Sequence, residues 1–349
     1  MVYSPLSRGA ENGEGPQADS PADLGQVAIA AADALLEDLE HARRLSADWT
    51  DEELAFALLR GAMDRCLHAL AETDCWGKAN QAASNEFWKR TGDLLGLGSL
   101  QARARGKPRG YAGDHEMFVQ FYERRCVEHP LGKLFDRYFQ LQAAVEAVRS
   151  RTEQIAAAMT SHFLRLGADR PYRAVSVGCG PAIDFELAAR WLGERQRQLS
   201  LALLDLDGDA VEHALDRLRS VLHEEQLLGV RDNLYRLADK PKSAALVQEA
   251  DFLVCPGLFD YLSDEAAIKL LRLFWNGLKP RGMLLVGNFA PHNPTRAYME
   301  WIGDWRLIYR APAELAKLAE AAGIPRTTFQ IGAERLGIDL FLRAEKPAA

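Results

Sequence analysis

Two short apolar runs in the middle of this chain end in residues that could bind a ligand. The first ends in the turn Gly178-Cys179-Gly180, and the second ends in Asp205, 25 positions after Gly180. Glycines at a strand end let a ligand approach the bare backbone, where a side chain would collide. A carboxylate at the end of the next strand can accept two hydrogen bonds from a ribose diol. The pattern predicts a strand–turn–helix–strand unit that holds an adenosyl group.

The residues after Gly180 narrow the kind of adenosyl ligand. A dinucleotide site usually has a third glycine, where the helix N-terminus packs against the pyrophosphate. The run 181–186 has no glycine, and it places Asp184 and Glu186 in the first turn of the expected helix. These acids would repel a pyrophosphate but tolerate a sulfonium or ammonium group. The pattern resembles motif I of class I S-adenosylmethionine-dependent methyltransferases, in which Asp205 matches the ribose-binding acid.

Composition and charge exclude several classes of function. The 349 residues are 48% hydrophobic, enough for a sizeable core and for more than one typical domain. The net charge of −7, from 42 basic and 49 acidic residues, gives no general attraction to nucleic acid. The five cysteines have no metal-binding spacing and suggest reduced thiols. With no signal-peptide pattern and no long apolar run, we expect a cytoplasmic protein with no metal, nucleic-acid or membrane partner.

The first half of the chain reads as helical. Residues 1–20 are rich in Gly, Pro, Ser and acids and predict a disordered tail, followed by a helical domain over 21–165. Ser20-Pro21 should cap the first helix, and the box Thr50–Glu53 the second. We expect another helix over 86–95 and two more between 115 and 166, broken near His129-Pro130. This domain could form a lid over the site or the interface of a homodimer.

Residues 170–349 have the pattern of an α/β domain. Short apolar runs alternate with helical segments, which predicts a mainly parallel, Rossmann-like sheet covered on both faces. The seven expected strands are Ala174–Val177, Ser200–Leu204, Asn233–Leu237, Phe252–Cys255, Met283–Asn288, Thr327–Ile331 and Ile338–Leu342. Only six residues join the last two, too few for a parallel crossover, so they should pair antiparallel. The methyltransferase resemblance implies the same terminal hairpin.

Two loops at the carboxyl ends of these strands carry candidate site residues. Pro256 and Gly257 follow the fourth strand and should line the methyl donor and the acceptor; Asp260 or Tyr261 could orient the acceptor. The fifth strand ends near Asn288 and continues into a segment rich in aromatic, amide and charged residues. Within it, His292 has the pKa range of a general base, and Tyr298 could face the ligand. The alternative is that these aromatic residues seal the core and His292 lies at the surface.

A third candidate loop, Lys107–Asp114, precedes the sheet. Its glycines and proline do not suit a helix, so we expect a shaped loop between the two halves of the chain. Arg109 could hold the carboxylate of the cofactor's methionine part in two parallel hydrogen bonds. Tyr111 could face the sulfonium, and Asp114 could accept from the α-ammonium. The alternative is a structural linker.

Three motifs together make the resemblance more specific. Arg109–Asp114, the Gly178–Pro181 turn and Asn293–Trp301 resemble a bacterial group of class I methyltransferases that includes enzymes of 3-hydroxy fatty acid methyl ester biosynthesis. The likeness covers roughly residues 80–345. It implies S-adenosylmethionine binding under a helical lid and methyl transfer to a small acid, with its carboxylate as a candidate acceptor, in secondary metabolism.

Two other functions stay open at this point. The same scaffold resembles enzymes that cyclise S-adenosylmethionine to azetidine-2-carboxylate and methylthioadenosine. A protein that binds an adenosyl ligand without turnover is the third hypothesis. The residues that we expect to take part in catalysis are Tyr111, Asp114, Asn288, His292 and Tyr298. Those that we expect to bind the cofactor are Arg109, Gly178, Cys179, Gly180, Asp205, Pro256 and Gly257.

Overall fold

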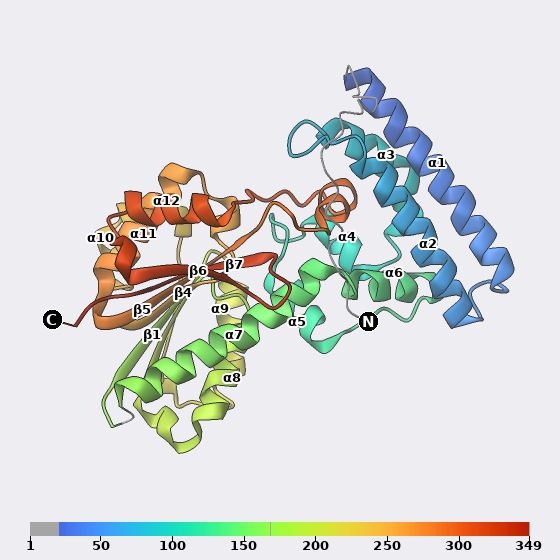
Figure 1. Ribbon diagram of the computed structural model, residues 1–349. Helices are drawn as coiled ribbons and strands as arrows, with labels where there is room; N and C mark the ends of the chain where they lie inside the picture. Colours follow the sequence, from blue (N-terminus) through green and yellow to red (C-terminus); the bar gives the residue numbers. More distant parts are fainter. Residues whose placement is uncertain (1–20, 168, 349) are drawn as a thin grey trace.

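The computed structural model describes residues 21–167 and 169–348, and it shows a group of helices beside a helix-covered sheet (Figure 1). The expected disordered tail and the Ser20 cap lie outside the described residues. The helical part comprises α1 (Pro21–Leu45), α2 (Glu52–Ala71), α3 (Gln81–Leu95), α4 (Ser99–Gly106), α5 (His115–Glu123), α6 (Pro130–Gln140) and α7 (Ala143–Leu166). In the described part of the chain, no helix is both long and apolar enough to cross a bilayer.

The sheet has seven strands in the order β3-β2-β1-β4-β5-β7-β6. The strands are β1 (Tyr172–Val177), β2 (Leu199–Asp205), β3 (Leu227–Arg231), β4 (Ala250–Cys255), β5 (Leu278–Phe289), β6 (Phe329–Ala333) and β7 (Asp339–Glu345). Strands β1 to β5 are parallel, whereas β7 runs antiparallel to both β5 and β6. The expected Rossmann-like sheet with an antiparallel last hairpin is confirmed.

Helices cover both faces of the sheet because the strands are apolar on both sides. Neighbouring residues of β1 show this: Ala174 packs with α7, α8 and α9, and Val175 packs with α11 and α12. The helices of the second half are α8 (Ile183–Leu192), α9 (Gly208–Leu218), α10 (Pro241–Ala245), α11 (Asp264–Gly277) and α12 (Pro312–Ala321). The short helical turns are η1 (Gly193–Gln198), η2 (Glu224–Gln226), η3 (Leu234–Asp239), η4 (Phe259–Tyr261), η5 (Tyr298–Ile302) and η6 (Arg326–Thr328).

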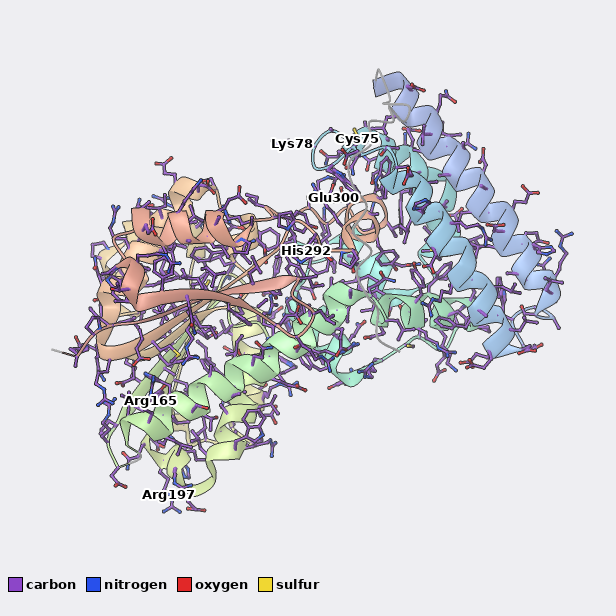
Figure 2. All side chains as sticks on the ribbon, viewed as in Figure 1. Cys75, Lys78, Arg165, Arg197, His292 and Glu300 are labelled. Carbon is purple, nitrogen blue, oxygen red and sulfur yellow. The ribbon has the colours of Figure 1, made fainter. Side chains whose placement is uncertain are left out.

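The segment after β5 leaves the sheet and packs into the core of the helical part. Tyr298, Trp301 and Ile302 are buried among side chains of α2, α3, α4 and α6. The carboxylate of Glu300 accepts hydrogen bonds from the Gly77 backbone N–H at 2.6 Å and from Asn80 Nδ2 at 3.1 Å. Figure 2 shows Glu300 between the two halves of the molecule. This segment fixes the helical part against the carboxyl ends of the strands.

Three local expectations were wrong. The third strand is Leu227–Arg231, whereas Asn233–Leu237 falls mostly in η3, because Asn233 caps that turn by accepting from the Tyr235 N–H. The strand β3 was missed because it contains Gly229, a residue that is more common in loops. A side chain at this position would collide with Val211 and Leu215 of α9.

The other two corrections concern helices. Helix α2 is capped by Asp51, which accepts from the Leu54 N–H, while the Thr50 hydroxyl donates to the Ala47 carbonyl. The region 115–166 holds three helices: it breaks at His129-Pro130 as expected, and again where Gln142 adopts an extended conformation.

Candidate active site

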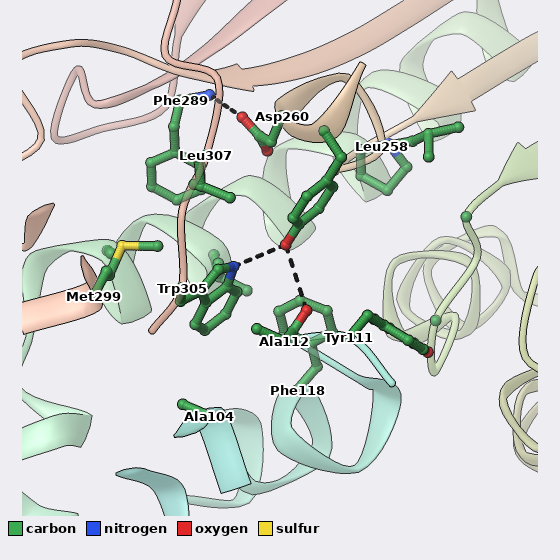
Figure 3. A pocket seen from close by; sticks show the side chains of 18 of the residues that line it. Ala104, Tyr111, Ala112, Phe118, Leu258, Asp260, Phe289, Met299, Trp305 and Leu307 are labelled. Carbon is green, nitrogen blue, oxygen red and sulfur yellow. Dashed lines mark hydrogen bonds between the residues drawn. The ribbon is translucent and has the colours of Figure 1, made fainter. Parts of the chain in front are cut away.

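A cavity lies between the carboxyl ends of the strands and the helical part, with about 1290 Å³ of empty space that includes open solvent at its mouth. From the sheet it is lined by Gly178, Gly180, Asp205, Leu206, Leu234, Tyr235, Pro256, Gly257, Leu258, Asp260, Tyr261 and Phe289. From the helical part and its loops it is lined by Ala104, Tyr111, Ala112, Gly113, His115, Phe118, Phe121, Phe139, Ala144, Val145, Val148 and Arg151. The segment after β5 adds Thr295, Tyr298, Met299, Gly303, Trp305 and Leu307 (Figure 3).

Asp205 and the glycine turn form one end of this cavity. One Asp205 oxygen accepts from the Gly180 N–H at 3.0 Å, and the other accepts from the Asp207 N–H at 3.1 Å. Gly178 and Gly180 have φ angles of +73° and +49°, which side chains rarely adopt. Burial raises the pKa of Asp205, but these backbone donors act against that shift. The turn therefore presents bare backbone beside a buried acceptor.

Two exposed apolar side chains stand beside Asp205. Leu206 is 40% exposed and Tyr235 is 49% exposed, and both line the cavity. Large apolar side chains that remain exposed at a cavity wall mark a surface that a ligand can cover. Leu206 could have been considered from the sequence because it directly follows Asp205. Tyr235 was not considered as a site residue because we expected 233–237 to form a strand. Both side chains therefore add apolar surface to the cavity that Asp205 also lines.

The loop 107–114 covers the cavity from the helical side. Arg109 is not among the lining residues, contrary to the expected role in binding the cofactor's carboxylate. Its guanidinium pairs with Asp207 at 3.0 Å, Asp209 at 2.7 Å and Glu116 at 2.7 Å. These pairs tie the loop to the start of α9. Tyr111 does line the cavity, with its hydroxyl 3.5 Å from Asp207 Oδ2.

Asp114 and Cys179 occupy structural positions. Asp114 caps α5 by accepting from the Met117 N–H at 3.0 Å, and Arg103 Nε donates to both of its oxygens at 2.8 Å. Cys179 is buried in the apolar cluster beneath the turn, and burial raises the pKa of its thiol. Neither side chain lines the cavity, so the expected direct contacts of Asp114 and Cys179 with a ligand are not supported by their placement.

Asn288 and His292 also lie outside the cavity. Asn288 is fully buried: its Nδ2 donates to Asp260 Oδ1 and to the Ile308 carbonyl, each at 2.9 Å, and its Oδ1 accepts from Arg310 at 2.8 Å. It holds two loops together because a buried amide must satisfy its hydrogen bonds. His292 is exposed, with Nε2 3.0 Å from the Gly337 carbonyl (Figure 2).

Tyr298 is the one residue of the segment after β5 that the sequence assigned to catalysis and that lines the cavity. Its hydroxyl donates to Gln101 Oε1 at 2.6 Å, and the side chain is buried. The structure thus brings Tyr111, Gly178, Gly180, Asp205, Pro256, Gly257 and Tyr298 to one cavity. The residues that do not line it are Arg109, Asp114, Cys179, Asn288 and His292.

Arg151 of α7 is a lining residue that sequence reasoning missed. Its Nη1 donates to the Pro256 carbonyl at 2.9 Å and to Asp339 Oδ2 at 2.8 Å, and its side chain is 7% exposed. A faint signal was present, because Arg151 continues the apolar stripe of Val145 and Val148 at helical spacing. An arginine on such a stripe must find a partner or a ligand.

Two buried carboxyl groups lie next to Arg151. Burial, together with the charge of Asp339, raises the pKa of Asp260 to about 8. Burial likewise raises the pKa of Asp339 to about 6, against the effect of Arg151. The Asp260 carboxyl lines the cavity and accepts from the Phe289 N–H at 2.7 Å. Next to it, the Tyr261 hydroxyl accepts from Trp305 Nε1 at 2.8 Å and donates to the Ala112 carbonyl at 3.4 Å, linking three loops (Figure 3).

Comparison with known proteins identifies the fold. No family model and no curated protein sequence matches the chain. A solved structure described as a possible exported protein from Bordetella parapertussis aligns with a TM-score of 0.55 at 18% identity, over 92% of this chain and 97% of that one. The CurJ carbon methyltransferase aligns with a TM-score of 0.50 at 13% identity, over 93% and 91%. The fold is that of a class I methyltransferase.

The raised pKa of Asp260 predicts how stability depends on pH. In the unfolded chain the pKa of an aspartate is about 3.9, whereas in the folded protein the pKa of Asp260 is about 8. Between these two pH values the folded protein binds one proton more than the unfolded chain, so its stability falls as the pH rises. Raising the pH from about 6 to about 8 should therefore cost the wild type about 2 kcal/mol of unfolding free energy. Asp260→Asn imitates the protonated carboxyl and should remove most of this loss in denaturant titrations.

The exposed Asp216 provides the matched control, because Asp216→Asn should leave the wild-type pH dependence unchanged. Equal pH dependence in the wild type and Asp260→Asn would show that Asp260 is already ionised at neutral pH.

Proposed function

We propose that this protein is an S-adenosylmethionine-dependent methyltransferase that acts on a small molecule, with a carboxylate oxygen as the acceptor. The observation that carries the proposal is the Gly178–Gly180 turn, hydrogen-bonded to Asp205 at the end of a large apolar cavity. One structural neighbour, the CurJ carbon methyltransferase, supports the general activity. The motifs of the sequence support a small acid as the acceptor.

The residues at the Asp205 end of the cavity fit the cofactor. Leu206 and Tyr235 provide apolar surfaces for a planar base, and the buried Asp205 carboxylate provides acceptors for a ribose diol. At Gly180 the ideal position for a Cβ faces the cavity-lining Phe118 at 3.8 Å, so any larger side chain would occupy the space above the turn. When bound, S-adenosylmethionine supplies an electrophilic methyl group to the site.

The rest of the cavity suits a reaction that needs positioning and exclusion of water. Its walls beyond the glycine turn are mainly apolar, including Phe121, Phe139 and Met299. An ionised carboxylate acceptor needs no general base at neutral pH. His115 is the histidine that lines the cavity; burial lowers its pKa, and it stands at the Asp207 side, 3.6 Å from that carboxylate. Among the described residues, no group of three or more His, Cys, Asp and Glu could hold a metal ion.

Product analysis separates this function from the two alternatives. The protein is incubated with S-adenosylmethionine alone and then with a panel of small carboxylic acids. Formation of S-adenosylhomocysteine only when an acid is present supports methyl transfer. Methylthioadenosine without any acceptor would identify the cyclase, for which no contact among residues 21–167 and 169–348 gives specific support. Cofactor binding without either product would indicate a non-catalytic binding protein.

For location and partners, the sequence-based expectations stand as proposals. We propose a cytoplasmic protein of secondary metabolism whose partner is its small-molecule substrate. All five cysteines are free, in keeping with reduced thiols. A homodimer built through the helical part remains a prediction, and analytical ultracentrifugation would test it.

We predict that Asp205→Ala weakens binding of S-adenosylhomocysteine by about 1–3 kcal/mol, because a ribose diol would lose a charged acceptor and the turn its hydrogen bond to Gly180. Calorimetric titration measures this loss. Asp216→Ala, an exposed substitution on α9, serves as the control and should bind normally. An unchanged affinity in Asp205→Ala would remove this carboxylate from the cofactor site.

We further propose that the loop 107–114 is a lid whose closed position depends on Arg109. Arg109→Ala removes three ion pairs, those to Glu116, Asp207 and Asp209, so the lid should open more often. Turnover should fall at least about tenfold, equal to about 1.4 kcal/mol in the barrier. The melting temperature should change little, because the pairs are near the surface.

Hydrogen exchange provides the second measurement of the lid. Exchange in 107–114 should slow when S-adenosylhomocysteine is added to the wild type, and much less in Arg109→Ala. Arg125→Ala, which removes an exposed arginine from the loop after α5, is the matched control. Normal turnover in Arg109→Ala, with no ligand-dependent protection in the wild type, would reduce the loop to a linker.

A further inference from the structure

One face of α7 forms a wall of the cavity and changes character along its length. Ala144, Val145, Val148 and Arg151 all line the cavity, at helical spacings that place them in one stripe. The first turn of this stripe, from Ala144 to Val148, is apolar, and Arg151 presents a guanidinium about one turn further on. A ligand lying along the stripe would therefore meet an apolar surface first and a positive charge at the end of it.

The hydrogen bonds of Arg151 occupy only one of its nitrogens. Nη1 donates to the Pro256 carbonyl and to Asp339, whereas Nε and Nη2 donate to no group of the described residues. Nε and Nη2 lie on the same edge of the guanidinium, the edge that binds a carboxylate in two parallel hydrogen bonds. Gly257 leaves space beside this group, since an added Cβ would lie 3.7 Å from Nη2.

Arg151 is placed at the acceptor side of the cavity by the order of the strands. The predicted ribose acceptor, Asp205, ends β2, whereas Arg151 contacts the residue after β4 and the first residue of β7. Asp339 in turn pairs with Phe289 at the end of β5. Neighbouring strands are about 4.8 Å apart, so β5 lies roughly 14 Å from β2. The glycine turn after β1 stands between the two sites.

We propose that Arg151 anchors the acceptor, by binding the acceptor's carboxylate through Nε and Nη2 while the apolar body lies along Val145 and Val148. This inference rests on the proposed methyl transfer and assigns a specificity-determining residue to it. Asp339 fixes the orientation of the guanidinium. Two other buried acids interact with Arg151. Burial raises the pKa of Asp260 to about 8, so this carboxyl is mostly protonated at neutral pH, whereas burial raises the pKa of Asp184 only to about 6, so that carboxyl is mostly ionised there.

The reaction itself would weaken this contact. An acceptor oxygen forms a bond to the methyl carbon as the carbon–sulfur bond breaks, the electron pair stays on sulfur, and no proton moves. The carboxylate becomes a neutral ester, which loses the charge-assisted hydrogen bonds to Arg151. The site should therefore bind an acid more tightly than its methyl ester, which favours release of the product.

The test compares acids with their methyl esters in the protein saturated with S-adenosylhomocysteine. The probes are 3-phenylpropanoate and 4-methylpentanoate, each titrated beside its ester at neutral pH. We expect the wild type to bind at least one acid about tenfold or more tightly than the matching ester. An equal affinity for acids and esters, or no binding of either acid, would overturn the proposal.

The variants are chosen to avoid leaving a buried charge unpaired. Removing Arg151 alone would leave the buried Asp339 carboxylate without its ion-pair partner, which would destabilise the protein. The double variant Arg151→Met with Asp339→Asn therefore replaces both members of the pair. It should lose the preference for the acid. Asp339→Asn alone keeps the guanidinium and should keep the preference, while Arg151→Lys keeps the charge without the paired donors and should fall between them. A preference that survives in the double variant would contradict the proposal.

A final comparison separates this role from binding of the cofactor. S-adenosylhomocysteine carries a carboxylate, and methylthioadenosine does not. The double variant should bind both as the wild type does. If the double variant bound S-adenosylhomocysteine more weakly but methylthioadenosine normally, Arg151 would bind the cofactor's carboxylate. That result would overturn the proposed role of Arg151 without contradicting the proposed methyl transfer. A wild type that binds neither compound would contradict the proposed function itself.

Discussion

The carboxylate of Asp205 joins the ends of two neighbouring strands and so sets the geometry of the whole cavity. Its two oxygens accept from the Gly180 and Asp207 backbones, which belong to the turns after β1 and β2. Gly178 donates to the Leu204 carbonyl at 2.8 Å and closes the same junction. These hydrogen bonds stabilise the positive φ angles of Gly178 and Gly180. The buried acid thus builds the turn and remains available to a ligand.

The helical part covers this strand-end site on one side and so makes it a cavity with a mouth open to solvent. Glu300 binds Gly77 and Asn80 on one side, and Arg296 on its own segment at 2.8 Å. Arg296 also stacks between the rings of Trp76 and Tyr309, at 4.6 and 4.7 Å. This junction links the helical part to the sheet, whereas the loop 107–114, which we propose as a lid, is joined to α5 and to the start of α9 by the ion pairs of Arg109.

The sequence was informative where function depends on local pattern. A strand, a glycine turn and an acid on the next strand must lie together in this fold, so Gly178, Gly180 and Asp205 could be predicted. Asp114 and Asn288 show the limit, because the residue types that do chemistry also cap helices and fill buried hydrogen bonds. Asp114 stands directly before an amphipathic helix, which is a capping signal that could have been recognised.

The stripe of α7 singles out Arg151, but its role could not have been predicted, because this role depends on contacts with residues 105 and 188 positions away. The exposure of Leu206 likewise becomes visible only once the cavity is formed.

The most direct test of the central claim is the crystal structure of the protein with S-adenosylhomocysteine. We predict that both ribose hydroxyls donate to the Asp205 carboxylate and that the base lies against Leu206 and Tyr235. On the far side of the glycine turn, Nε and Nη2 of Arg151 should make no contact with the ligand. Ligand density elsewhere in the molecule, or a ribose without contact to Asp205, would contradict it.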